Sequence, residues 1–165
     1  MQGPSGFWFL DGMDIWNNFN IGIQDGLAKF IPLTKRKDSI TNNWSDQNGI
    51  DVDVSRHFFS ERTVSLNCWI FTESENEFWT KRNAFIQQWA KPGLRRLTVT
   101  AHQGRSYFVI FQEVSGYTQV KSHTLKNLPD NMIVHEFTIT LLEPQPQADY
   151  GDVFIAADNG EFLIV

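Results

Sequence analysis

The chain is short of cysteine, of long apolar runs and of basic residues, and each shortage excludes a class of protein. A single cysteine, Cys68, cannot form a disulfide within the chain and leaves no cysteine-based metal site. No run of about 18 apolar residues is present, so no membrane-spanning helix is predicted. The N-terminus lacks a basic segment followed by an apolar one, which argues against a signal peptide. We therefore expect a soluble protein, made in a reducing cytoplasm.

The charge balance argues against a nucleic-acid-binding domain. Acidic residues number 19 and basic residues 14, for a net charge of −5, whereas nucleic-acid-binding domains present a basic face. The three consecutive basic residues at 35–37 are too few for a binding patch, and we interpret them as a solvated turn. No specific nucleic-acid binding is expected.

Motifs that carry chemistry are missing as well. The four histidines are distant from one another in sequence, and none lies in a metal-binding pattern. The chain has no nucleophile elbow, no phosphate-binding loop and no dinucleotide-binding glycine pattern. We predict no catalytic, cofactor-binding or metal-binding residue, no cofactor, and no enzymatic activity.

Aromatic residues, in contrast, are abundant, and the apolar pattern is mostly that of strands. Phe, Trp and Tyr make up 14% of the chain, and such residues are enriched in strands and at interfaces. Alternation is clearest at 62–71, where Val64, Leu66, Cys68 and Ile70 share one face. Asp11-Gly12 between short apolar runs predicts a hairpin. Further strands are predicted at 7–10, 13–16, 19–23, 50–54, 94–101, 106–114, 117–125 and 132–142, with a turn at 127–131 and a polar loop at 41–49.

One segment has helical spacing. Ser74 and Glu77 form a capping box, and Phe78, Phe85 and Trp89 follow on one face up to Pro92. We predict an amphipathic helix at about 75–90 lying on a sheet. The fold class is mainly β (α+β): a β-sandwich or barrel-like arrangement of antiparallel sheets with one packed helix.

The chain divides near residue 142. Residues 1–142 are predicted to form the β-sandwich domain, and residues 143–165 a proline-containing linker followed by a C-terminal hairpin. Asp158-Asn159-Gly160 is the turn signal of that hairpin. A lone hairpin is marginal in water, so it must add to its own sheet or reach a neighbouring copy.

The order of these elements resembles the N-terminal domain of the distal tail proteins of long-tailed phages, and the related tail-tube and baseplate-hub folds. The resemblance covers roughly residues 5–142. It is carried by the hairpin at Asp11-Gly12, the loop around Trp44, the strand Arg62-Thr63-Val64-Ser65-Leu66, the segment Glu75-Asn76-Glu77-Phe78-Trp79-Thr80-Lys81-Arg82 that leads through Phe85 to Pro92-Gly93, and the hairpin of Leu97-Thr98-Val99 with Tyr107-Phe108-Val109.

The resemblance implies a structural role. Members carry one helix on a short β-sandwich, and six copies close into a ring. Distal tail proteins usually have a second domain, for which 143–165 is too short, so the resemblance points to a minimal ring-former. It implies a homo-oligomer that contacts other tail proteins in the virion, after assembly in the bacterial cytoplasm. The choice between a distal tail or baseplate adaptor and a tube component stays open.

Two surfaces are candidates for that role. The candidate subunit interface consists of Phe7, Trp8, Phe9, Val153, Phe154, Phe162 and Ile164. Asp51 and Asp53 are candidates for an acidic face of the lumen, where negative charge would let DNA pass without sticking.

The alternative function is a carbohydrate-binding β-sandwich module, in which exposed aromatic rings stack on sugars. The test that separates the two is whether Trp16, Trp44, Trp69 and Trp79 include coplanar exposed rings. A third hypothesis, a small β-rich enzyme, requires a deep pocket with His57 or His123 beside acids.

Overall fold

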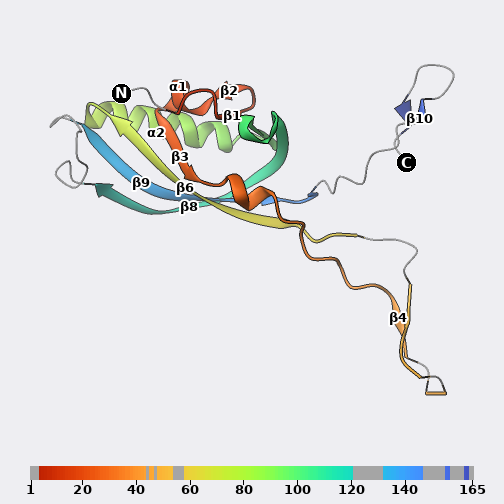
Figure 1. The fold of residues 1–165 in the computed structure, drawn as a ribbon. Helices are drawn as coiled ribbons and strands as arrows, with labels where there is room; N and C mark the ends of the chain where they lie inside the picture. Colours follow the sequence, from red (N-terminus) through yellow and green to blue (C-terminus); the bar gives the residue numbers. More distant parts are fainter. Residues whose placement is uncertain are drawn as a thin grey trace.

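The computed structural model describes residues 4–43, 45–46, 48–53, 58–120, 132–146, 155–156 and 162–163. Its main feature is a seven-stranded antiparallel sheet in the order β2-β1-β7-β8-β9-β6-β3 (Figure 1). The strands are β1 (Trp8–Leu10), β2 (Met13–Asp14), β3 (Ile21–Asp25), β6 (Arg62–Thr72), β7 (Arg95–Val99), β8 (Arg105–Val120) and β9 (Ile133–Glu143). The predicted fold class, mainly β with one packed helix, is confirmed.

The long strand β8 joins the two halves of this sheet. Its first residues, Arg105 to Val109, pair with β7, and the stretch from Ile110 to Val120 pairs with β9. Because one strand changes partner along its length, the β1–β7 half can fold over toward the β6–β9 half. The core lies between these two halves and the helix.

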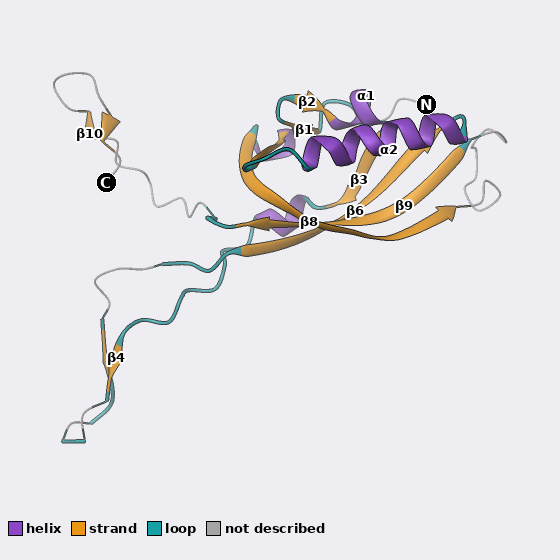
Figure 2. Ribbon diagram, turned by 180° about the vertical axis from the view of Figure 1, so that it is seen from behind, coloured by secondary structure: helices purple, strands orange, loops and turns teal. Residues whose placement is uncertain are grey.

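The helix α2 (Glu75–Trp89) covers one face of β3, β6 and β9 (Figure 2). Ser74 caps it, because its Oγ accepts the Glu77 N–H at 3.2 Å, and Glu77 in turn accepts the Glu73 N–H at 2.9 Å. Phe78, Phe85 and Trp89 are buried, as the helical spacing predicts.

The core is continuous across all of these elements. Strand β6 pairs with β9 over its full length, and every second residue of each strand points inward. Alternate residues of β1, β7 and β8 supply the opposite wall. The fully buried members are Leu10, Ile15, Ile21, Leu66, Ile70, Phe85, Leu97, Val99, Val109, Ile139 and Leu141.

Two sequence predictions need correction in the N-terminal region. The strand predicted at 13–16 ends at Asp14, because Asp14 instead caps a short helix, α1 (Ile15–Phe19), by accepting the Asn17 N–H at 2.9 Å. The strand predicted from residue 19 begins at Ile21, after Asn20 ends α1 in a left-handed conformation with φ 55°. The hairpin turn is confirmed: Asp11 and Gly12 both have positive φ, at 51° and 85°.

The separate strand predicted at 117–125 is also wrong over its described part. Tyr117 to Val120 are the end of β8, which continues through an irregularity between Ser115 and Thr118. Gly116, with φ 70°, supplies the positive φ that such a bulge requires, so the chain bends without leaving the sheet. Residues 121–125 and the turn predicted at 127–131 lie outside the described residues.

The remaining elements are short. Two 3₁₀ helices, η1 (Leu27–Phe30) and η2 (Thr100–His102), follow β3 and β7. β4 (Thr41–Asn42) pairs with β5 (Asp51–Val52), and β10 (Ile155–Ala156) pairs with β11 (Phe162–Leu163), both antiparallel. The described helices include none that is long and apolar enough to cross a membrane.

A carboxylate in the first turn ties three elements together. Asp11 accepts hydrogen bonds from the Arg96 N–H at 3.0 Å and from Gln88 Nε2 at 2.6 Å. It also forms an ion pair with Arg95 at 3.3 Å, and both side chains are largely buried. This one residue therefore connects the β1–β2 turn, α2 and β7.

Replacing Asp11 by Ala is expected to lower the free energy of unfolding by about 2 kcal/mol, because buried partners lose a charged acceptor. Asp11→Asn keeps the acceptor oxygen and a residue that tolerates positive φ, so its loss is expected to be smaller. Urea titrations of both variants measure this, with Asp38→Ala on an exposed site as the control. Equal stability of Asp11→Ala and wild type would contradict the connecting role.

A second carboxylate is buried at the end of β9. Glu143 is 2% exposed, and its Oε2 lies 3.0 Å from Arg62 Nε without forming a well-directed hydrogen bond. Burial raises the pKa of Glu143 above its ordinary value of 4.5, and the Arg62 charge lowers it by less. The folded state therefore holds this proton more strongly than the unfolded state does.

This gives Glu143 a stability contribution that is present below pH 4.5 and is lost as the pH rises through the raised pKa. We expect wild type to lose more stability than Glu143→Gln between pH 4.5 and neutrality. Urea titrations of both proteins across that range measure the difference. A difference in unfolding free energy between the two proteins that stays constant, or that grows in favour of wild type as the pH rises, would contradict this. Either result would show that the Arg62 charge affects the pKa of Glu143 at least as strongly as burial does.

Candidate functional site

A long two-stranded arm is the most distinctive surface feature. Residues 31–61 leave the body beside the start of β6, with β4 and β5 near the far end (Figure 1). Its two chains are joined by the Ser60 N–H to Lys35 O bond at 2.9 Å, the Lys37 N–H to Phe58 O bond at 2.8 Å and the Asp53 N–H to Ile40 O bond at 3.0 Å. The arm is therefore an irregular hairpin held mainly by its own backbone.

The arm exposes an unusual number of apolar side chains. Six of them are between 47% and 74% exposed: Ile31, Leu33, Ile40, Ile50, Val52 and Phe58. Among the described residues of the strand predicted at 50–54, only Asp51–Val52 is a strand, and Ile50 and Val52 are exposed instead of half-buried. Val54 lies outside the described residues. Ile50-Asp51-Val52-Asp53 alternates like a strand with one covered face, yet nothing in the described part of this chain covers it.

The base of the arm is firmly attached. Arg62 Nη1 donates to the Phe30 carbonyl, and the guanidinium lies 6.0 Å from the centre of the Phe30 ring. The Phe30 ring is buried and lies 4.3 Å from the ring of Tyr107 in β8. Arg62 thus joins the outgoing and returning chains of the arm, and Glu143 fixes it to the end of β9.

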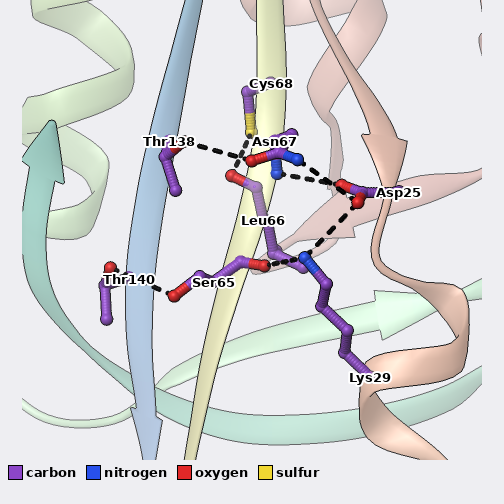
Figure 3. A network of polar contacts seen from close by, with 8 residues as sticks. All are labelled: Asp25, Lys29, Ser65, Leu66, Asn67, Cys68, Thr138 and Thr140. Atoms are coloured by element: carbon purple, nitrogen blue, oxygen red, sulfur yellow. Dashed lines mark hydrogen bonds and ion pairs between the residues drawn. The ribbon is translucent and has the colours of Figure 1, made fainter. Parts of the chain in front are cut away.

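The face of the sheet opposite α2 is polar. Asn67 donates to Asp25 through its backbone N–H at 3.3 Å and its side-chain amide at 3.2 Å, and it accepts from Thr138 at 3.1 Å (Figure 3). Lys29 forms an ion pair with Asp25 at 3.5 Å.

The same polar face extends along β6 and β9. The hydroxyls of Ser65 and Thr140 lie 3.5 Å apart, and Lys29 also donates to the Ser65 carbonyl. Cys68 belongs to the other face, where burial raises the pKa of its thiol far above the ordinary range, so it is not a nucleophile. The described polar face carries hydroxyls, amides and the Lys29–Asp25 ion pair.

An aromatic cluster lies at the far end of this face. The Trp69 ring is 5.3 Å from that of Trp16 and 4.3 Å from that of Phe71, and all three are partly exposed. Trp69 rests on Gly22 of β3, where an added Cβ would lie 2.3 Å from the indole. The Trp16 and Trp69 planes meet at 69°, so they form no flat platform for a sugar ring.

Of the other two tryptophans of the carbohydrate-binding hypothesis, the described one, Trp79, gives no platform either. The Trp79 ring is half-exposed and lies 5.6 Å from the Arg82 guanidinium, which also lies 5.5 Å from the Tyr117 ring. Trp44 lies outside the described residues. The coplanar exposed rings that the hypothesis requires are therefore not found among the described tryptophans.

The structure describes only part of the candidate subunit interface. Phe7 is 53% exposed beside β1, whereas Trp8 is 6% exposed and packs in the core, with Phe9 partly buried. Phe162 lies in β11, for which only the backbone is described. Val153, Phe154 and Ile164 lie outside the described residues.

Asp51 and Asp53 are both exposed on the arm, and Asp53 donates its N–H to Ile40. The structure brings these two acids together on the arm, apart from Phe7. Sequence reasoning missed the arm as a unit. The signal that could have revealed it was the run of apolar residues separated by polar ones from 31 to 58, without a helix to cover it.

The histidines do not converge on a site. His102 Nδ1 is hydrogen-bonded to the Tyr107 hydroxyl at 2.8 Å, and His135 stacks on Phe78 with ring centres 4.2 Å apart. Burial lowers the pKa of His135 below its ordinary value, and the Glu75 charge raises it by less. His57 and His123 lie outside the described residues. Among the residues that the structure describes, no cluster of possible metal ligands occurs.

Comparison with known proteins gives a match in fold alone. No protein-family model matches the chain, and no curated protein matches it in sequence. Among solved structures it is similar to the SPP1 Dit (gp 19.1) protein, described as a paradigm of the hub adsorption apparatus in phages that infect Gram-positive bacteria. The TM-score is 0.57 at 11% identity, and the match covers 85% of this chain and 50% of that one.

The chain thus spans half the length of that distal tail protein. The match confirms the resemblance that the order of elements predicts. This chain therefore shares the β-rich fold of the SPP1 Dit protein.

Proposed function

We propose that this chain is a structural protein of a phage or prophage tail, in which six copies close into a ring. It would act as a distal tail or baseplate adaptor, or as a tube-like component, in contact with other tail proteins of the virion. The observation that carries the proposal is the arm, with its row of exposed apolar side chains. The fold shared with the SPP1 Dit protein supports it.

The arm supports assembly because it is not a stable structure by itself. An isolated two-stranded hairpin is marginal in water, and this one exposes side chains that water disfavours. The alternation at 50–53 also belongs to a strand with one covered face. A surface on another molecule that covers the arm would stabilise the hairpin and remove its apolar side chains from water. Another copy of this chain can supply that surface.

The charge of such a ring suits the passage of DNA. Six copies carry a formal charge of −30, six times the −5 of one chain. A lumen of net negative charge repels the phosphate backbone, so DNA slides without binding. Asp51 and Asp53 are our candidates for an acidic lumen surface.

Light scattering on a sizing column tests ring formation. We expect a concentration-dependent species of about 115 kDa, six times the 19.1 kDa of one chain, with a central hole in negative-stain images. A smaller closed oligomer would correct the copy number. A monomer at every concentration, with no rings on the grid, would overturn self-assembly.

Replacing Ile40, Ile50 and Phe58 together by Ser tests the role of the arm. These side chains are at least 60% exposed, so the fold and the unfolding temperature of one copy should not change. Association should weaken at least roughly tenfold, since each buried apolar side chain contributes on the order of 1 kcal/mol or more. Leu27→Ser, at an exposed site off the arm, is the matched control. Unchanged assembly of the triple variant would exclude the arm from the contact.

A further inference from the structure

We propose that the arm of one copy docks on a defined patch of the next copy, at the end of the body opposite the arm. We call it the receptor patch: the three aromatic residues Trp16, Trp69 and Phe71 with the acids Glu73 and Glu136. This proposal deepens the one above and rests on it, because it presupposes that copies assemble.

The receptor patch combines an apolar centre with an acidic border. Trp69 and Phe71 lie on the outer face of β6, and Trp16 contacts both rings. Glu136 is the cross-strand partner of Trp69 on β9, and Glu73 follows Phe71 by two residues, just beyond the end of β6. Both acids are exposed, and neither forms an ion pair within the described residues.

Other charges near the receptor patch are already engaged or lie on the helix. Glu77 accepts hydrogen bonds from Glu73 N–H and Asn20. Lys81 donates to the Asn18 carbonyl, and Arg82 lies between the rings of Trp79 and Tyr117. On the outer face at this end, the acids Glu73 and Glu136 therefore supply negative charge without forming an ion pair among the described residues.

The arm presents the complementary chemistry. Exposed Lys35 and Lys37 flank Arg36 on the outgoing chain, and Leu33 and Phe58 are the exposed apolar side chains closest to them in the hairpin. Basic side chains beside apolar ones fit an aromatic patch bordered by acids, through both cation–π and ion-pair contacts. In this docking, the three basic residues at 35–37, interpreted from sequence as a solvated turn, contact the acids of the receptor patch.

The geometry also suits a ring. The arm joins the body at the start of β6, and the receptor patch lies at the end of the same strand, so the two surfaces face opposite ways (Figure 1). Donor and receiver are different surfaces, and such a head-to-tail contact generates a ring when the rotation between copies closes and an open filament when it does not. The eleven residues from 33 to 43 span at most roughly 36 Å, and the eleven of β6 span roughly 35 Å, so the arm is comparable in length to the strand it would cross.

A charge exchange on the full-length chain tests this docking. Lys35→Glu with Lys37→Glu on the arm, or Glu73→Lys with Glu136→Lys on the patch, should each weaken association roughly tenfold or more, because like charges then face each other. Mixing the two double variants does not restore every contact of a ring, so all four changes are also combined in one chain. That chain should recover assembly. Glu113→Lys, an exposed acid on β8, is the matched control.

The outcomes separate this proposal from the one it rests on. Suppose that wild type assembles and either double variant assembles equally well: the receptor patch is then wrong, and self-assembly stands. The same conclusion follows if the fourfold variant does not recover assembly although each double variant keeps the circular dichroism and unfolding temperature of wild type. If wild type never associates, self-assembly itself fails. The docking is supported if the fourfold variant assembles while both double variants do not. If the substitutions only damaged the fold, their losses of association would add up in the fourfold variant.

Discussion

Strand β8 is the constraint on which the rest of the structure depends. It pairs with β7 through Val109 and with β9 from Ile110 onward, so one continuous backbone belongs to both halves of the sheet. Tyr107 and Val109 face the core from the first half, and Val114 packs against it from the second. If β8 did not change partners, the β1–β7 half of the sheet could not close over Leu66 and Ile139. The Asp11 contacts to Gln88 and Arg95 then fix the closed arrangement.

This closure determines which surfaces are left for other molecules. Helix α2 and the β1–β7 half cover the inner face of β6 and β9, and their outer face stays polar, as is usual for an antiparallel sheet with one solvated face. The hydroxyls of Ser65, Thr138 and Thr140 lie there. Six of the exposed large apolar side chains lie on the arm, next to the start of β6, and the partly exposed rings around Trp69 lie at its other end.

The sequence predicted the elements whose partners lie within the chain. The helix expected at about 75–90 is Glu75–Trp89, and the strand expected at 62–71 is Arg62–Thr72, because their apolar periodicity matches a core that this chain itself supplies. The same reasoning failed at 50–54, where the periodicity is equally clear and the covering surface is missing. Apolar periodicity indicates that one face of a strand is covered, but it does not identify the molecule that covers that face. In the N-terminal errors, capping by Asp14 turned predicted strand residues into α1, and at Gly116 a bulge let β8 continue where a separate strand was expected.

An apolar arm must also avoid pairing with any strand it meets before it reaches its partner. Long, flat and apolar hairpin edges recruit other strands and aggregate, and lysines and short strands prevent this. The arm has both features: β4 and β5 are two residues each, and Lys35 and Lys37 interrupt the apolar positions. The same lysines that hinder indiscriminate edge pairing favour a surface with unpaired acids. Selectivity for one partner thus follows from the residues that keep the free arm from aggregating, and the irregular hairpin is better suited to a specific contact than a regular one would be.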